Sequence, residues 1–118
     1  MTLNTPLTYE QALQKVKEVV EKESPYEDYE APNDTSIQMA ALLIFNLHDI
    51  TINLSTTVEG GIYIGIVNEH KIMHVELYND GDLGYIVEDT RGDLWENEDV
   101  ETVKEMIDII KKFCILEA

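Results

Sequence analysis

Residues 50–89 read ITINLSTTVEGGIYIGIVNEHKIMHVELYNDGDLGYIVED, and this stretch decides the fold class. Within it, four segments place an aliphatic or aromatic residue at every second position, as Ile62, Ile64 and Ile66 illustrate. A period of two among β-branched and aromatic residues is typical of strands that bury one face. The pattern therefore predicts four consecutive β-strands.

Three short connections separate the predicted strands, and each is rich in residues that favour turns. They are Glu-Gly-Gly at 59–61, Asn-Glu-His-Lys at 68–71 and Asn-Asp-Gly-Asp at 79–82. Connections of this length join strands that lie side by side and run in opposite directions. We therefore expect a four-stranded antiparallel meander.

The segments before and after the meander have apolar residues at helical spacing, which predicts helices on both sides of it. The first predicted helix covers residues 9–23, where Thr8 and Gln11 have the spacing of a capping box. The last predicted helix covers residues 100–116, with Asp99 as its expected N-cap. Both helices are amphipathic, so each is expected to bury one face.

A second helix is predicted over residues 35–48, with Asp34 or Thr35 as its N-cap. No charged residue occurs from position 35 to 47, and apolar residues surround nearly the whole helix. A short helix of this kind is usually buried on more than one side. We expect it to be the central helix.

The predicted order is α-α-β-β-β-β-α in one domain covering residues 1–118, which is an α+β class. We expect the three helices to cover one face of the sheet. Residues of mixed chemistry would then occupy the other face, which is either covered by a loop or a contact surface. They are Tyr63, Val67, Ile72, His74, Glu76, Tyr78 and Ile86.

The meander resembles small, uncharacterised bacterial and cyanobacterial α+β proteins. The shared pattern is Gly-Gly-Ile at 60–62, Val-Glu-Leu at 75–77, Asp-Gly at 80–81 and then Tyr85. It covers roughly a quarter of the chain and consists mainly of hairpin residues. Those relatives often have Glu-Trp where this chain has Gly65 and Ile66. The resemblance implies the same fold and no particular activity.

Acidic residues dominate the charge of the chain. Asp and Glu number 24 against 8 Lys and Arg, which gives a net charge of −16 at pH 7. Such a charge repels phosphate, so direct binding to nucleic acid or to an anionic membrane is not expected. The longest apolar run has seven residues, 39–45, whereas a membrane-spanning helix needs about 20.

The expected compartment is the cytoplasm. Residues 1–7 show neither the basic nor the apolar region of an export signal. Cys114 is the only cysteine, so the chain forms no internal disulfide. A single thiol suits a reducing environment.

No metal or cofactor is predicted. Glu69, His70 and His74 lie close in sequence, but on a turn and a strand this spacing does not bring four ligands together. The acids of the turns depart from the EF-hand pattern. These acids are Asp80, Asp82, Asp89 and Asp93.

Catalysis is not expected either. Cys114 falls on the apolar stripe of the last helix, and the chain contains no Gly-x-Ser-x-Gly motif or phosphate-binding loop. An acid pair that hydrolyses a substrate stays open as an alternative, because 24 acids allow many pairs.

The negative charge is concentrated in two segments. Residues 21–34 contain six acids and one lysine, and residues 76–101 contain ten acids and one arginine. Together they hold −14 of the −16 charges and include several aromatic residues. Tyr and Trp among charges are typical of recognition surfaces, although an acidic surface also serves solubility alone.

The favoured hypothesis is a non-enzymatic interaction protein that binds a basic protein partner, as an immunity protein or a DNA mimic would. The partner could be a nuclease, a toxin or a nucleic-acid-binding protein. The alternatives are a homodimer that uses the open sheet face, and a small metal- or metabolite-dependent enzyme. The predicted contact residues are Tyr26, Tyr29, Asp80, Asp82, Glu88, Asp89, Asp93 and Trp95.

Overall fold

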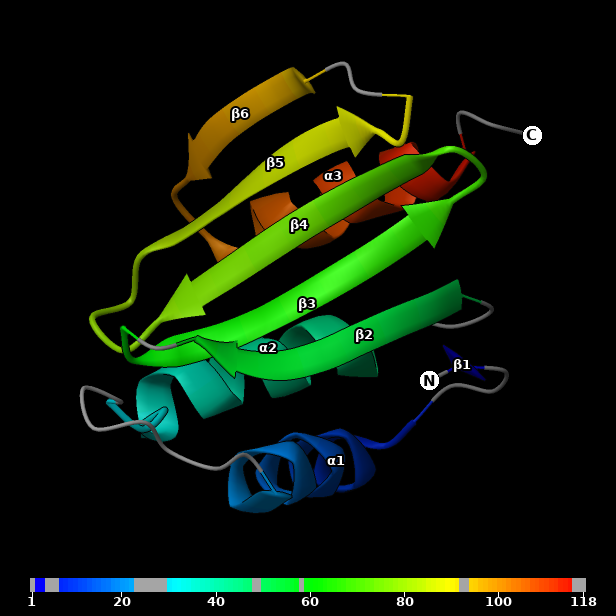
Figure 1. Cartoon of the computed structure of the whole chain (residues 1–118). Helices are drawn as coiled ribbons and strands as arrows, with labels where there is room; N and C mark the ends of the chain where they lie inside the picture. Colours follow the sequence, from blue (N-terminus) through cyan, green and yellow to red (C-terminus); the bar gives the residue numbers. More distant parts are fainter. Residues whose placement is uncertain are drawn as a thin grey trace.

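A computed structural model describes most of the chain (Figure 1). The described residues are 2–3, 7–22, 30–47, 50–57, 59–91 and 94–115. The elements follow in the order β1 (Thr2–Leu3), α1 (Tyr9–Lys22), α2 (Asp34–Phe45), β2 (Ile50–Thr57), β3 (Gly61–Asn68), β4 (Lys71–Tyr78), β5 (Leu83–Asp89), β6 (Leu94–Val100) and α3 (Val103–Ile115).

All strands belong to one antiparallel sheet in which neighbours in sequence are neighbours in space, from β1 to β6. The predicted four-stranded meander is confirmed as β2, β3, β4 and β5, and so is the α+β class. The two-residue strand β1 extends the sheet beside β2, and β6 extends it beside β5.

Strand β6 was not expected, because its sequence LWENEDV lacks a clear apolar alternation. It forms as the pairing partner of β5, and Asp99 lies opposite Gly84. The prediction of Asp99 as a helix cap is therefore wrong, and α3 begins at Val103 instead of Val100. Thr102 precedes the helix, and its Oγ1 accepts a hydrogen bond from the backbone N–H of Glu105 at 3.1 Å.

The capping box of α1 is confirmed. The backbone N–H of Gln11 donates to Thr8 Oγ1 at 3.1 Å, and the backbone N–H of Thr8 donates to Gln11 Oε1 at 2.9 Å. Helix α2 has a different cap from the predicted Asp34 or Thr35. Asn33 Oδ1 accepts from the N–H groups of Thr35 and Ser36, at 3.0 and 3.3 Å.

Figure 1 shows all three helices on one face of the sheet, as expected. Helix α2 is central, because it contacts β3, β4 and both other helices. Its Leu43 and Ile44 are fully buried. They lie in one apolar core with the helix-facing residues of the strands, among them Ile52, Ile62, Ile64, Ile66, Met73, Val75, Leu77, Leu83 and Val87.

No helix among the described residues is both long and apolar enough to cross a membrane.

Two adjacent leucines of α2 test the importance of this core. Leu43 is fully buried and Leu42 is 39% exposed. We expect Leu43→Ala to lower the free energy of unfolding by about 2–5 kcal/mol, because it removes buried apolar contacts and leaves a cavity. Leu42→Ala should cost less than about 1 kcal/mol. Urea denaturation measures both, and equal losses would contradict this packing.

Candidate functional site

The face of the sheet opposite the helices carries the set of side chains that the alternation predicted. Val67 is 43% exposed and Ile86 is 37% exposed, and none of the described helices covers them. We call the outward-pointing residues of β3, β4 and β5 the open face. They are Gly61, Tyr63, Gly65, Val67, Ile72, His74, Glu76, Tyr78, Gly84, Ile86 and Glu88.

A chain of hydrogen bonds crosses the open face on three neighbouring strands. The hydroxyl of Tyr63 on β3 lies 2.6 Å from Nδ1 of His74 on β4. On the other side, Nε2 of His74 lies 2.7 Å from Oε1 of Glu88 on β5. His74 reaches both partners diagonally, because Gly65 and Ile86 are its directly paired neighbours.

The direction of these bonds follows from the carboxylate of Glu88 and from the tautomer of His74. An ionised carboxylate only accepts, so Nε2–H of His74 donates to Glu88. In the tautomer that carries its proton on Nε2, Nδ1 has a free lone pair, and the hydroxyl of Tyr63 donates to it. Both ring nitrogens of His74 are therefore engaged within the protein.

Gly65 allows Tyr63 to take this position. A Cβ atom at residue 65 would lie 2.6 Å from the Tyr63 hydroxyl oxygen and 3.1 Å from two ring carbons. The ring of Tyr63 thus lies over the glycine and fills the place of its missing side chain. Burial, together with the negative charges of Glu88 and Glu76, raises the pKa of Tyr63, so its hydroxyl stays a donor.

A second pair lies beside this chain, where the hydroxyl of Tyr78 donates to Oε2 of Glu76. Tyr63 is the paired neighbour of Glu76 on β3. Glu76 and Glu88 are therefore both held by hydrogen bonds from neighbouring side chains. The open face combines oriented carboxylates with exposed apolar groups.

Asn79, in the β4–β5 turn, connects the two acidic segments of the sequence. Its Oδ1 accepts from the backbone N–H of Asn33 at 2.8 Å and from the hydroxyl of Ser36 at 2.7 Å. Its Nδ2 donates to the carbonyl of Ala31 at 2.9 Å and to Oε2 of Glu30 at 3.1 Å. These bonds hold the described end of segment 21–34 against segment 76–101.

The β2–β3 turn joins the same end of the molecule. The backbone N–H of Asn79 donates to the carbonyl of Gly60 at 2.9 Å, and Glu30 forms a backbone bridge with Glu59. Exposed carboxylates therefore gather there from three segments, and we call this group the acidic end. Its members are Glu30, Asp34, Glu59, Asp80 and Asp82. None of them forms an ion pair with another described residue.

The predicted contact residues do not form one group. Asp80 and Asp82 belong to the acidic end, and Oδ1 of Asp80 also accepts from the N–H of Asp82 at 2.9 Å. Glu88 lies on the open face near the other end of β5, roughly 20 Å along the strand from Asp82. The remaining predictions include residues outside the described part of the chain, namely Tyr26, Tyr29 and Asp93. Trp95 lies in β6, where only the backbone is described.

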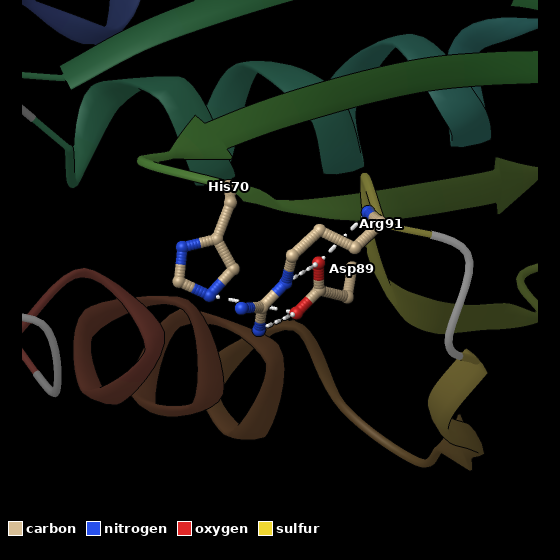
Figure 2. Close-up of polar contacts among 3 residues, drawn as sticks. All are labelled: His70, Asp89 and Arg91. Carbon is tan, nitrogen blue, oxygen red and sulfur yellow. Dashed lines mark hydrogen bonds and ion pairs between the residues drawn. The ribbon is translucent and has the colours of Figure 1, made fainter.

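Asp89 is buried and does not face a partner, so its prediction as a contact residue is wrong. Its side chain is 1% exposed and points to the helix side of the sheet. Oδ1 accepts from Nε of Arg91 at 2.9 Å and Oδ2 accepts from its Nη2 at 2.7 Å (Figure 2). Nε2 of His70 lies 3.4 Å from Oδ2. This cluster ties the β3–β4 turn to the end of β5.

The two described histidines lie on opposite faces of the sheet. His74 belongs to the open face, whereas His70 lies beside Asp89 on the helix side. The described residues contain no group of three His, Cys, Asp or Glu that could hold a metal ion. Cys114 packs against the core, and burial raises the pKa of its thiol. The described geometry thus offers two surfaces, the open face and the acidic end.

No model of a known protein family matches this chain, and neither a curated protein nor a solved structure shows significant similarity to it. The function therefore has to be argued from the two surfaces themselves.

The sequence predicted parts of the open face and of the acidic end. The alternation predicted the open face, and the charge count pointed to the segment that contains the β4–β5 turn. The role of Asn79 was missed, because an asparagine in an Asn-Asp-Gly turn is explained by the turn alone. Only its contacts with residues 30–36 reveal that it also anchors α2.

Removal of the Asn79 amide tests this connection. We expect Asn79→Ala to lower the free energy of unfolding by about 1–3 kcal/mol, because the hydroxyl of Ser36 and the backbone N–H of Asn33 lose their hydrogen bonds to Oδ1 of Asn79. Asn53→Ala is the matched control on the exposed part of β2 and should cost less than about 1 kcal/mol. Equal losses in urea denaturation would show that the amide does not join the segments.

Asp89 makes the free energy of unfolding depend on pH in the acidic range. Its hydrogen bond with Arg91 holds its pKa at about 2, below the ordinary value of 3.8. A lowered pKa in the folded state adds stability that is present above pH 3.8 and is lost as the pH falls to about 2. We expect Asp89→Asn to flatten the curve of unfolding free energy against pH in this window.

Arg91→Gln should flatten the same curve, because it removes the main cause of the lowered pKa. Denaturation at several pH values measures both variants. If both keep the slope of the unchanged protein, the ion pair does not contribute.

Proposed function

We propose that this chain is a non-enzymatic interaction protein that binds a basic protein partner through its acidic end. One observation carries the proposal: Asn79 draws residues 30–36 and the β4–β5 turn together, so exposed carboxylates from separate segments share one end of the molecule. Charge that only served solubility would need no such connection.

The state of these carboxylates supports a role in binding. Lacking ion pairs with described residues, the members of the acidic end keep their negative charge available for a partner. Neighbouring charges of one sign create a field that speeds the approach of an oppositely charged protein. Nucleic acid has the wrong charge for this surface.

The contacts of the two described histidines, His70 and His74, support binding in preference to catalysis. His74 uses both ring nitrogens within the protein, and His70 lies beside the Asp89–Arg91 pair. A general base needs a nitrogen within hydrogen-bond reach of the substrate. These contacts leave the acidic surface as the feature that best explains the charge pattern.

Two variants of equal charge test the proposal by affinity capture from a cell extract. The first neutralises the acidic end with Glu30→Gln, Asp34→Asn, Glu59→Gln, Asp80→Asn and Asp82→Asn. The second neutralises five exposed acids on the helices with Glu10→Gln, Glu18→Gln, Glu21→Gln, Glu105→Gln and Asp108→Asn. The amides keep the size of each side chain and the acceptor oxygens at Glu30 and Asp80.

We expect the unchanged protein and the helix variant to retain a basic protein that the acidic-end variant loses. Each rim charge contributes about 0.2–1 kcal/mol, so the five together should change the affinity at least about fivefold. Binding should weaken as salt rises from about 0.05 to about 0.5 M. Equal loss in both variants, or capture that does not depend on salt, would reject the proposal.

A further inference from the structure

The open face begins where the acidic end stops. Tyr78 closes β4 on the open face and directly precedes Asn79 in the turn. Its paired neighbour Gly61 follows Gly60, whose carbonyl accepts from Asn79. A partner seated on the acidic end therefore reaches the open face without crossing another described element.

The apolar part of the open face spans the width of one helix. Val67 on β3 pairs with Ile72 on β4, and Ile86 lies on β5. Val67 and Ile86 are thus two strand spacings apart across the sheet, or roughly 10 Å, and Ile86 is offset along the strands because it pairs with His74. An α-helix with side chains has a diameter of about 10–12 Å. The exposed apolar groups match the contact stripe of one amphipathic helix.

The charged part of the open face is entirely acidic. Its carboxylates belong to Glu76 and Glu88, and none of its residues is Lys or Arg. Hydrogen bonds from Tyr78 and His74 engage one oxygen of each carboxylate, Oε2 of Glu76 and Oε1 of Glu88. Because these bonds restrain both side chains before binding, less conformational entropy is lost when a cation arrives.

We infer that the open face docks an amphipathic, arginine-bearing helix of the basic partner. This inference rests on the proposed function and specifies the partner surface. The apolar stripe of the helix covers Val67, Ile72 and Ile86, and its arginines pair with Glu76 and Glu88. Arginine fits better than lysine, because its planar guanidinium pairs with carboxylates and stacks on tyrosine rings.

A second copy of this chain fits the open face less well. Two copies joined face to face would bring Glu76 and Glu88 of both chains into one interface. The open face offers no Lys or Arg to pair with them. Unpaired carboxylates are costly to bury. The charge of the open face therefore selects a cationic occupant.

Two synthetic 18-residue peptides of identical composition test the inference. In the ordered peptide, leucines at i, i+3, i+4 and i+7 form one stripe and arginines flank it; in the scrambled peptide both residue types are spread around the helix. We expect the unchanged protein to bind the ordered peptide at least about tenfold more tightly, by calorimetry, because only this peptide buries the apolar groups.

Variants of the protein show which surface is responsible. The double variant Val67→Thr, Ile86→Thr should remove the preference for the ordered peptide, while its circular dichroism spectrum shows that the fold is kept. Threonine keeps the β-branched shape that suits strands. The double variant Glu76→Gln, Glu88→Gln should bind the ordered peptide less tightly than the unchanged protein does. This loss of affinity should be larger than the loss for an ordered peptide that has lysine in place of each arginine.

The acidic-end variant separates this inference from the proposed function. It should weaken both peptides by the same factor and leave the preference for the ordered one intact. If it weakens neither, the proposed function fails. If the unchanged protein binds both peptides equally, or the threonine variant keeps the preference, the docking inference fails. A dimer at about 100 μM by light scattering that the threonine variant dissociates would assign the open face to a second copy and overturn the inference.

Discussion

The burial of one face of the sheet against α2 is the constraint on which the rest of this structure depends. The isoleucines of β3 and the helix-facing residues of β4 pack on a helix that carries no charge beyond its first residue. Since α2 is apolar on most sides, α1 and α3 pack beside it, and they contact β2 and β6 respectively. The resulting two-layer arrangement leaves the other face of the sheet without a helix.

Polar contacts at the strand ends complete this arrangement. At one end, Asn79 fastens the start of α2 to the β4–β5 turn, and at the other, Asp89 binds Arg91 beside His70. Both groups use polar side chains from turns and strand ends, outside the apolar core. The contacts at Asn79 bring exposed carboxylates together, whereas those at Asp89 remove a carboxylate from the surface.

The open face and the acidic end together give the molecule an acidic surface with an apolar part. The carboxylates of Glu76 and Glu88 are held by Tyr78 and His74, so this surface is ordered in advance of any partner. Both proposals follow from this combination of charge and restraint. A basic protein with an amphipathic helix would satisfy the charge and the apolar groups at the same time.

The sequence by itself determined the α+β class, the four central strands, the central helix and most of the open face, because alternation and helical spacing are local signals of burial. It did not predict β6, whose charged residues form a strand only because β5 offers a free edge. The burial of Asp89, the diagonal contacts of His74 and the meeting of the acidic segments at Asn79 were decided by the tertiary structure. These features join residues up to 49 positions apart, and such pairings depend on how the strands and turns are placed in space.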